Sequence, residues 1–353
     1  MKKKILKRTG IILLSILLIL TLVIIALFWN ELRSLSSIKK VDDYGMFQMT
    51  YYGDYGFDDF LLTGASSDRD IENFVIRRLL KGLPIDLNIT GGGCTAFITR
   101  NGDGEVIYGR NFDFDYAPSM QVVTRPKNGY ASISTVNLSF VGYSEGNLPS
   151  GLNINSFLTL AAPFLPFDGM NEKGLAIALL AVPEAEPQFD ENKVTLNTTT
   201  AIRLVLDKAA TVDEAVELLR QYNIYFSGGI DCHFLIADAS GSSVLVEYYD
   251  DDLQVVTTSE NYQIASNFIA YNDLNVGEGF DEFERYDKVK FEIENNNGTL
   301  SEEQALDLLA EIGVIANDED KLQWSVVYNL SSLNGVIFAN RNTDNLIEFE
   351  LKP

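Results

Sequence analysis

Three glycines at residues 91–93 precede Cys94, the residue of this chain best suited to nucleophilic chemistry. A strand-like run follows Cys94, and after a glycine-containing turn a second run at 105–110 leads to Arg110 and Asp113. A hairpin of this length returns the end of the second run to the start of the first. The sequence therefore predicts a thiol, a guanidinium and a carboxylate clustered at one end of a sheet.

A thiol needs activation before it can attack, because its ordinary pKa of about 8.5 leaves it largely protonated at neutral pH. The chain has a single histidine, His233, and a Cys94–His233 dyad is one way to supply a base. His233 lies in a strand-like run at 232–237, where a structural hydrogen bond is the more usual role for a histidine.

Cleavage of the Gly93–Cys94 bond is another way to supply a base. Cys94 would then begin a chain, and its α-amine, with a pKa of about 7.7–8.0, could accept the thiol proton. Gly93 suits self-cleavage because it has no Cβ to hinder the approach of the thiol to its carbonyl group. Arg110 would favour the thiolate, and Asp113 could hold the amine. The purely structural alternative is a cysteine buried in a glycine-rich turn.

The same residues resemble the start of a known family. The segment Cys94-Thr95, followed by Gly109-Arg110-Asn111-Phe112-Asp113, is similar to the beginning of the choloylglycine hydrolases, which include bile salt hydrolases and penicillin V acylases. Relatives of that family include acid ceramidase, N-acylethanolamine acid amidase and isopenicillin N acyltransferase. Further matches follow in the family's order at residues 168–175, 238–247, 265–267 and 284–286.

The resemblance implies an α+β fold of the N-terminal-nucleophile hydrolase type, a four-layer αββα sandwich that cleaves linear amide C–N bonds without a metal or cofactor. It assigns Asn267 and the backbone N–H near Ala181 as donors to the oxyanion, and Arg285 as a support for the cluster of Cys94 and Asp113. The substrate loops stay unassigned. The aromatic candidates, each of which could also belong to the core, are Phe140, Tyr143, Phe157, Phe164 and Phe167.

The N-terminal part of the chain reads as a membrane anchor. Residues 11–29 form a run of 19 residues without a charge, which at about 1.5 Å per residue nearly spans a bilayer core of about 30 Å. Five Lys and Arg residues precede it, so the N-terminus should stay in the cytoplasm and the remainder should lie outside. A cleaved signal peptide is the alternative, although no A-x-A-like site follows residues 28–30.

These observations divide the chain into three parts. We expect a cytoplasmic N-terminus with a single-pass anchor at 1–29, a spacer and pro-segment at 30–93, and a catalytic domain at 94–353. The long segment before the nucleophile resembles the precursor forms of acid ceramidase and of the penicillin acyltransferase, which cut themselves before the cysteine.

Charge and cysteine content exclude some functions. The net charge is −23, and because residues 1–40 carry eight Lys and Arg against one Glu, the remainder totals −30. Such an acidic body argues against a nucleic-acid partner, since phosphate binding needs clustered basic residues. Cys94 and Cys232 could form a disulfide outside the cell, but a working nucleophile must stay free. Two cysteines and one histidine make no zinc site, and the sequence gives no signal for an oligomeric state.

The hydrophobic patterns predict alternating groups of strands and helices, typical of a layered α+β sandwich. The expected helices are 67–81, with its start at residues 67–70, then 199–209, 212–222, 280–295 and 301–313, the last opened by a Ser301–Gln304 capping box. The expected strands are 95–99, 105–110, 121–125, 131–138, 175–181, 232–237, 243–249, 253–257, 262–265, 324–328, 335–339 and 346–351. Residues 44–62, rich in Tyr, Phe, Gly and Asp, show no regular period.

Together these features predict a membrane-anchored, extracytoplasmic amidase that makes itself by cleavage before Cys94 and works through a thioester. Its substrate would be a small acyl amide; bile salts, penicillins, acyl-homoserine lactones and N-acyl lipids all remain open. One alternative is an acyltransferase that passes the same thioester to another amine. A second alternative is a non-catalytic cell-surface binding protein on this fold, in which the acidic body and residues 44–62 serve a partner.

Overall fold

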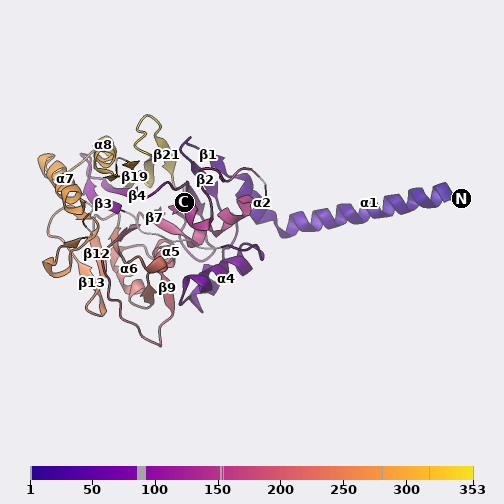
Figure 1. Cartoon of the computed structure of the whole chain (residues 1–353), viewed down its shortest axis with the longest axis horizontal. Helices are drawn as coiled ribbons and strands as arrows, with labels where there is room; N and C mark the ends of the chain where they lie inside the picture. Colours follow the sequence, from indigo (N-terminus) through magenta and orange to yellow (C-terminus); the bar gives the residue numbers. More distant parts are fainter. Residues whose placement is uncertain are drawn as a thin grey trace.

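Two β-sheets pack face to face and form the centre of the molecule (Figure 1). The computed structural model describes residues 2–85, 93–151, 153, 155–277, 279, 281–317 and 319–352, with residues 2–8 as backbone only. The larger sheet has nine strands, in spatial order β1 (Lys39–Lys40), β2 (Met46–Thr50), β5 (Ser119–Thr124), β6 (Ser132–Asn137), β7 (Pro166–Asn171), β8 (Ala176–Ala181), β11 (Cys232–Ala237), β12 (Ser243–Tyr249) and β13 (Asp252–Val256). The smaller sheet has six, β14 (Gln263–Ala265), β3 (Gly93–Arg100), β4 (Val106–Asp113), β19 (Leu322–Asn329), β20 (Asn334–Ala339) and β21 (Ile347–Glu350).

Helices cover the outer face of each sheet. On the larger sheet α5 (Thr198–Lys208) packs on β7 and β8, and α6 (Val212–Leu219) packs on β11 and β12. On the smaller sheet α7 (Glu282–Asn295) contacts β3 and β14, and α8 (Glu302–Ile312) contacts β4 and β19. The inner strands β3 and β8 touch each other, and both are buried along almost their whole length. The order of layers is therefore αββα, as the resemblance implied.

Every helix and strand expected from the hydrophobic patterns has a counterpart, with ends that differ by a few residues. Ser67 caps α4 (Asp68–Arg78) by accepting from the Asp70 backbone N–H, and the Ser301–Gln304 capping box opens α8. The patterns missed β2, β7, α2 (Trp29–Ser36) and α3 (Phe57–Leu61). The shorter elements are β9 (Thr195–Asn197), β10 (Asn223–Tyr225), β15 (Phe268–Ile269), β16 (Val276–Gly277), β17 (Ile315–Ala316), β18 (Glu319–Asp320), and the 3₁₀ turns η1 (Leu138–Val141), η2 (Asn155–Phe164), η3 (Ser227–Gly229) and η4 (Tyr271–Asp273).

The segment before Cys94 is built into the fold. β2 pairs in parallel with β5, from Met46 opposite Ser119 to Thr50 opposite Val123, so this segment supplies the edge of the larger sheet. Its aromatic side chains also surround Phe164, which is fully buried. The rings packed on Phe164, at centroid distances of 5.3–6.4 Å, are those of Tyr55, Phe57, Phe60 and Phe74.

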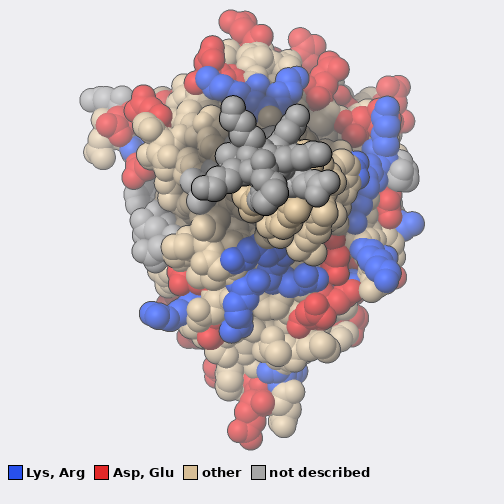
Figure 2. All heavy atoms as spheres, turned by 90° about the vertical axis from the view of Figure 1, so that its right-hand side faces the viewer, with Lys and Arg blue, Asp and Glu red and all other residues tan. Residues whose placement is uncertain are grey.

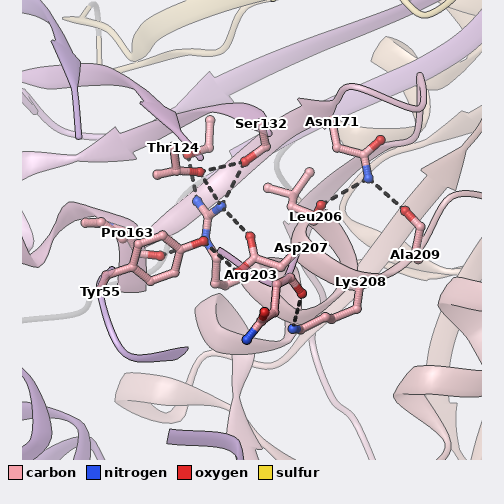
Figure 3. Close-up of polar contacts among 12 residues, drawn as sticks. Tyr55, Thr124, Ser132, Pro163, Asn171, Arg203, Leu206, Asp207, Lys208 and Ala209 are labelled. Atoms are coloured by element: carbon pink, nitrogen blue, oxygen red, sulfur yellow. Dashed lines mark hydrogen bonds and ion pairs between the residues drawn. The ribbon is translucent and has the colours of Figure 1, made fainter. Parts of the chain in front are cut away.

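A buried polar network joins the same segment to α5 (Figure 3). The Tyr55 hydroxyl donates to Asp207 Oδ2 at 2.6 Å, and Asp207 Oδ1 lies 3.2 Å from Arg203 Nη1. Both members of this ion pair are at most 1% exposed. The Arg203 guanidinium also donates to the Pro163 carbonyl oxygen and to the hydroxyls of Thr124, Ser132 and Ser134. Tyr55 thus completes a network whose other members all follow Cys94 in the sequence.

Helix α1 (Lys2–Leu27) extends away from the body (Figure 1). Its stretch Thr9–Leu27 has 19 residues with a mean hydropathy of 3.2 and is wholly exposed. A helix of this kind is typical both of a membrane anchor and of a signal sequence. Viewed towards the face from which α1 leaves, Lys and Arg side chains lie on both sides of the helix (Figure 2).

Candidate active site

Cys94 lies at the start of the central strand β3, buried between the sheets with 1% of its surface exposed. The β3–β4 hairpin sets Gly93 opposite Asp113 and Cys94 opposite Phe112. The same register places Arg110 two residues further along the hairpin, where its side chain reaches back to the thiol. The predicted grouping of a thiol, a guanidinium and a carboxylate is therefore present at this end of the smaller sheet.

The Arg110 side chain is fixed beside the Cys94 thiol. Its Nη2 lies 3.7 Å from Sγ and donates to the Leu179 carbonyl oxygen at 3.3 Å. Its Nε lies 3.2 Å from Asp168 Oδ2, and neither side chain of this pair is exposed. Asp168 also accepts from Trp324 Nε1 at 3.0 Å and from the Tyr328 hydroxyl at 2.6 Å. Asp168 and Leu179 of the larger sheet thus orient the guanidinium group of Arg110, which belongs to the smaller sheet.

Burial has the largest effect on the pKa of the Cys94 thiol. It raises the pKa of Cys94 to about 11, although Arg110, Arg285 and a hydrogen bond from the Ala181 backbone act in the opposite direction and Asp113 adds to the rise. Thiols with such a pKa are protonated at neutral pH. The Cys94 thiol would therefore have to give its proton to a base before it could attack a carbonyl group.

The Asp113 carboxyl is buried with one oxygen unused. Its Oδ1 accepts from the Val314 backbone N–H at 2.8 Å, whereas its buried Oδ2 has no hydrogen-bond partner among the residues that the structure describes. Burial raises the pKa of this carboxyl to about 6, against the lowering effects of Arg285, the Val314 N–H and Arg110. An amine created at Cys94 would meet a carboxylate oxygen that is ready to accept.

The raised pKa of Asp113 predicts a dependence of stability on pH. Between its ordinary pKa of 3.8 and about 6, the folded chain binds a proton that the unfolded chain has released, so rising pH destabilises the fold. An uncut Cys94→Ala chain should lose on the order of 1–2 kcal/mol more stability from pH 5 to pH 7.5 than its Asp113→Asn derivative. Urea denaturation at the two pH values measures this difference. Equal losses of stability in both chains would contradict a raised pKa at Asp113.

Asn267 and Arg285 hold the backbone at Cys94. The Cys94 N–H donates to Asn267 Oδ1 at 2.7 Å, and Arg285 Nη2 donates to the same oxygen at 2.9 Å. Arg285 Nη1 donates to the Cys94 carbonyl oxygen at 2.6 Å and to Thr95 Oγ1 at 2.5 Å, while its Nε pairs with Asp281 at 2.9 Å. Arg285 therefore positions the start of β3.

The predicted oxyanion donors lie next to the nucleophile. Asn267 Nδ2 donates to the Ala181 carbonyl oxygen at 2.8 Å, and this bond uses one of the two hydrogens that an amide nitrogen carries. The Ala181 backbone also hydrogen-bonds the Cys94 thiol. Gly93 fits tightly, because a Cβ there would lie 3.1 Å from Val314 Cγ2. Residues 91 and 92 of the glycine run lie outside the described residues.

A pocket of about 400 Å³ opens beside this cluster, and Gly93, Asp113 and Ala181 form part of its wall. Its volume suits one small molecule. The aromatic residues considered for the substrate loops do not line it. Four of them are at most 5% exposed, and all five pack in the main core: Phe140, Tyr143, Phe157, Phe164 and Phe167.

The histidine and the second cysteine have other surroundings. His233 Nδ1 lies 2.8 Å from Glu247 Oε1, and this carboxylate also accepts from the backbone N–H groups of Ala270 and Tyr271. No hydrogen bond between described residues joins His233 to Cys94. Neither Cys94 nor Cys232 forms a disulfide in the part of the chain that the structure describes. Within the described ranges, no group of three His, Cys, Asp or Glu side chains could hold a metal ion.

Some site residues carried no signal in the sequence. Asp168 stood in a segment that resembles the family, but nothing in its spacing indicated that it pairs with Arg110 from the opposite sheet. Thr95 and Asp281, the further partners of Arg285, are ordinary strand and helix-start residues in the sequence. Asn171 of the same segment is structural, because its amide donates to the Leu206 and Ala209 carbonyl oxygens at the end of α5 (Figure 3).

Comparison with known proteins identifies the family. A sequence model of the linear amide C–N hydrolases, choloylglycine hydrolase family, matches residues 94–296, more than half of the chain. The chain belongs to the choloylglycine hydrolase family. The match to this family begins at Cys94, the residue at the centre of the buried cluster.

Individual relatives support the family and the fold. The bile salt hydrolase/transferase of Clostridium perfringens is 27% identical over 185 residues, 48% of this chain and 54% of the relative. The penicillin V acylase of Pectobacterium atrosepticum is 37% identical over 113 residues, 28% of this chain and 29% of the relative. The chain thus spans about half or less of the length of these curated relatives.

Solved structures of family members share the fold. A mutant conjugated bile acid hydrolase from C. perfringens superposes with a TM-score of 0.53 at 18% identity, covering 73% of this chain and 92% of the other. The penicillin V acylase of Agrobacterium tumefaciens gives a TM-score of 0.55 at 19% identity, covering 73% and 86%. These likenesses establish the N-terminal-nucleophile hydrolase fold for this choloylglycine hydrolase relative.

Proposed function

We propose that the chain is a membrane-anchored cysteine amidase, which cleaves the linear amide bond of an acylated amine or amino acid after cleavage of its own Gly93–Cys94 bond. One observation carries the proposal: the family match begins at Cys94, and the backbone N–H and thiol of this residue are held by Asn267 and Arg110. A nucleophile placed at the first residue of the family segment needs a free α-amine, which cleavage supplies.

The self-cleavage step uses the groups around Gly93. The Cys94 sulfur adds to the Gly93 carbonyl carbon, the bond from that carbon to the Cys94 nitrogen breaks, and the nitrogen gains the proton that the thiol loses. Water then hydrolyses the resulting thioester and releases a Gly93 carboxylate, a free thiol and an α-amine. The unused Oδ2 of Asp113 is suited to accept a hydrogen bond from that amine.

Amide cleavage follows the same chemistry. The α-amine takes the thiol proton, and the thiolate, stabilised by Arg110, adds to the acyl carbonyl carbon. An N–H of the Asn267 amide and the backbone N–H at Ala181 stabilise the oxyanion. Collapse breaks the C–N bond, the α-ammonium group protonates the leaving amine, and water hydrolyses the thioester. Every step uses groups of the protein and water.

The proposal includes the three parts predicted from the sequence: an anchor at 1–29, a pro-segment at 30–93 and a catalytic domain at 94–353. The exposed apolar stretch Thr9–Leu27 supports the anchor. Five basic residues precede it, while Arg33, Lys39 and Lys40 follow closely, and this asymmetry favours a cytoplasmic N-terminus. The exposed side chains of these three residues also suit anionic lipid headgroups beside the anchor.

N-terminal sequencing of the purified full-length protein, together with a panel of small acyl amides, tests the proposal. A new N-terminus at Cys94 and release of free amine are the expected results. If the wild-type chain never separates on a denaturing gel and hydrolyses no amide, the protein is instead a binding protein on this fold. Thioester transfer to an added amine would show acyl transfer, which the name of the Clostridium relative includes.

We expect the substitution Asn267→Ala to lower kcat strongly. The substitution removes a donor to the oxyanion and also the acceptor of the Cys94 N–H, and loss of one oxyanion donor typically lowers kcat by about 10²–10³-fold. Steady-state kinetics with the best acyl amide measures the effect. Asn261→Ala, which removes an exposed amide that contacts the Gly298 carbonyl oxygen, is the matched control. A loss below tenfold would remove Asn267 from the mechanism.

A further inference from the structure

The pocket beside Cys94 carries more negative charge than its own cation neutralises. Its titratable wall residues are Asp113, Asp115, Asp231 and Lys321. The Lys321 ammonium already contacts two carboxylates, Asp115 at 2.8 Å and Glu319 at 2.7 Å. Lys321 is therefore unable to balance the other two aspartates as well.

The arginines near Asp113 do not supply the missing positive charge. Three of them lie close enough to lower the pKa of its carboxyl, but each is paired with a carboxylate of its own. The pairs are Arg110 with Asp168 at 3.2 Å, Arg285 with Asp281 at 2.9 Å, and Arg341 with Asp320 at 2.7 Å. Each pair is neutral as a whole, so the excess charge in the pocket stays negative.

Asp231 is the carboxylate best placed for a ligand. Its Oδ2 accepts from the Ala185 N–H at 2.9 Å, and its backbone oxygen accepts from the Val182 N–H at 2.9 Å. Its Oδ1 has no hydrogen bond with any described residue, and the residue is half-buried. Once the chain is cut, the Cys94 α-amine can pair with the Asp113 carboxylate. The Asp231 carboxylate then remains available to pair with the substrate.

The rest of the wall is largely apolar and limits the contact of Asp231 with water. These wall residues are Phe114, Val182, Pro183, Ile230, Val314 and Ala316. A charge in such a partly desolvated site interacts with a ligand charge more strongly than it would in bulk water. A cationic ligand group would pair with Asp231, whereas an anionic one would face a carboxylate of like charge.

We propose that this pocket takes an amide that bears a cationic group close to its scissile bond, and that it disfavours conjugates that end in a carboxylate or a sulfonate. The inference rests on the proposed amidase function and adds a substrate class to it. The carboxylates of the pocket would select the charge of the ligand, whereas the apolar wall would select its acyl chain.

A matched set of amides tests the inference on the full-length protein in detergent. One acyl group is joined to ethylenediamine, ethanolamine or glycine, which gives a cationic, a neutral and an anionic substrate of similar size. We expect kcat/KM to be about tenfold higher for the cationic than for the anionic amide. A second series with the ammonium group on the acyl end shows which side of the scissile bond the cation occupies.

Asp231→Asn should reduce this cation-to-anion ratio by about threefold or more, through a loss on the cationic amide and a gain on the anionic one. Asp213→Asn, which removes an exposed carboxylate from α6, changes the net charge equally and should leave the ratio as it is. An anionic amide that is cleaved as fast as the cationic one, or an unchanged ratio in Asp231→Asn, overturns the inference.

Binding measurements distinguish a failure of this inference from a failure of the amidase proposal. The same amides are titrated into the uncut Cys94→Ala chain by calorimetry, with about tenfold tighter binding expected for the cationic amide than for the anionic one. If wild type hydrolyses nothing but the cationic amide still binds preferentially, the amidase proposal fails and the pocket inference stands. If wild type hydrolyses the amides without a charge preference in either measurement, the pocket inference fails and the amidase proposal stands.

Discussion

Cys94→Ala should leave the chain uncut and without amidase activity, whereas wild type should be cut into residues 1–93 and 94–353. The substitution removes the sulfur atom that, in the proposed mechanism, attacks the Gly93 carbonyl group and, later, the substrate. Loss of a hydrolase nucleophile typically lowers kcat by on the order of 10⁴-fold or more. Denaturing gels, intact mass and amide hydrolysis measure the two effects on one preparation.

Cys232→Ala is the matched control, because Cys232 is also a buried cysteine outside any disulfide, 4% exposed and placed opposite Ala181 in the larger sheet. This variant should be cut and should hydrolyse amides as wild type does. Cleavage before residue 94 in the Cys94→Ala chain would show that another group, or a separate protease, breaks the bond. Labelling by an electrophilic acyl probe should be stoichiometric in Cys232→Ala and absent in Cys94→Ala.

The hairpin that carries the site could be predicted because its information is local. Two short runs of strand-forming residues and a glycine-containing turn fix the register that sets Gly93 opposite Asp113. The roles of Asn267 and Arg285 came from resemblance alone. Their contacts with Cys94 span more than 170 residues of sequence, and such separations leave no periodic signal in one chain.

The missed elements show where local patterns fail. β7 contains Pro166 and Gly169, residues that normally argue against a strand. Gly169 is needed there because a Cβ would lie 2.7 Å from the Ile133 carbonyl oxygen of the neighbouring strand. β2 has only five residues and pairs with a strand about 70 positions later. In both cases tertiary packing, rather than propensity, decides the structure.

The integration of the segment before Cys94 has a consequence for the cut protein. Residues 46–50 are hydrogen-bonded to β5 and Tyr55 is bonded to Asp207 inside the core, and neither contact involves the Gly93–Cys94 bond. We therefore expect the two pieces to stay together after cleavage, so that an uncleaved anchor would still hold the catalytic piece at the membrane. Co-elution of both pieces in native gel filtration measures this association.

Asp207→Ala should destabilise the chain more than any other single change in the buried network that Tyr55 joins to α5. Loss of the carboxylate leaves the Arg203 guanidinium, which is wholly buried, without its counter-ion, and removal of one partner of a buried ion pair typically costs about 3–5 kcal/mol. It also removes the acceptor of the Tyr55 hydroxyl. Urea denaturation of the uncut Cys94→Ala chain, followed by the fluorescence of buried Trp324, measures the stability.

Two controls separate the buried pair from its neighbours. Asp58→Asn breaks the ion pair of Asp58 with Lys208, in which the carboxylate is 50% exposed, and should cost less than about 1 kcal/mol. Tyr55→Phe removes one buried hydrogen bond and should cost about 1–2 kcal/mol. In the cut protein, Asp207→Ala should release the N-terminal piece at lower urea concentrations than either control does. If all three variants behave alike, the network of Arg203, Asp207 and Tyr55 does not help to hold the two pieces together, and the aromatic cluster around Phe164 must do so instead.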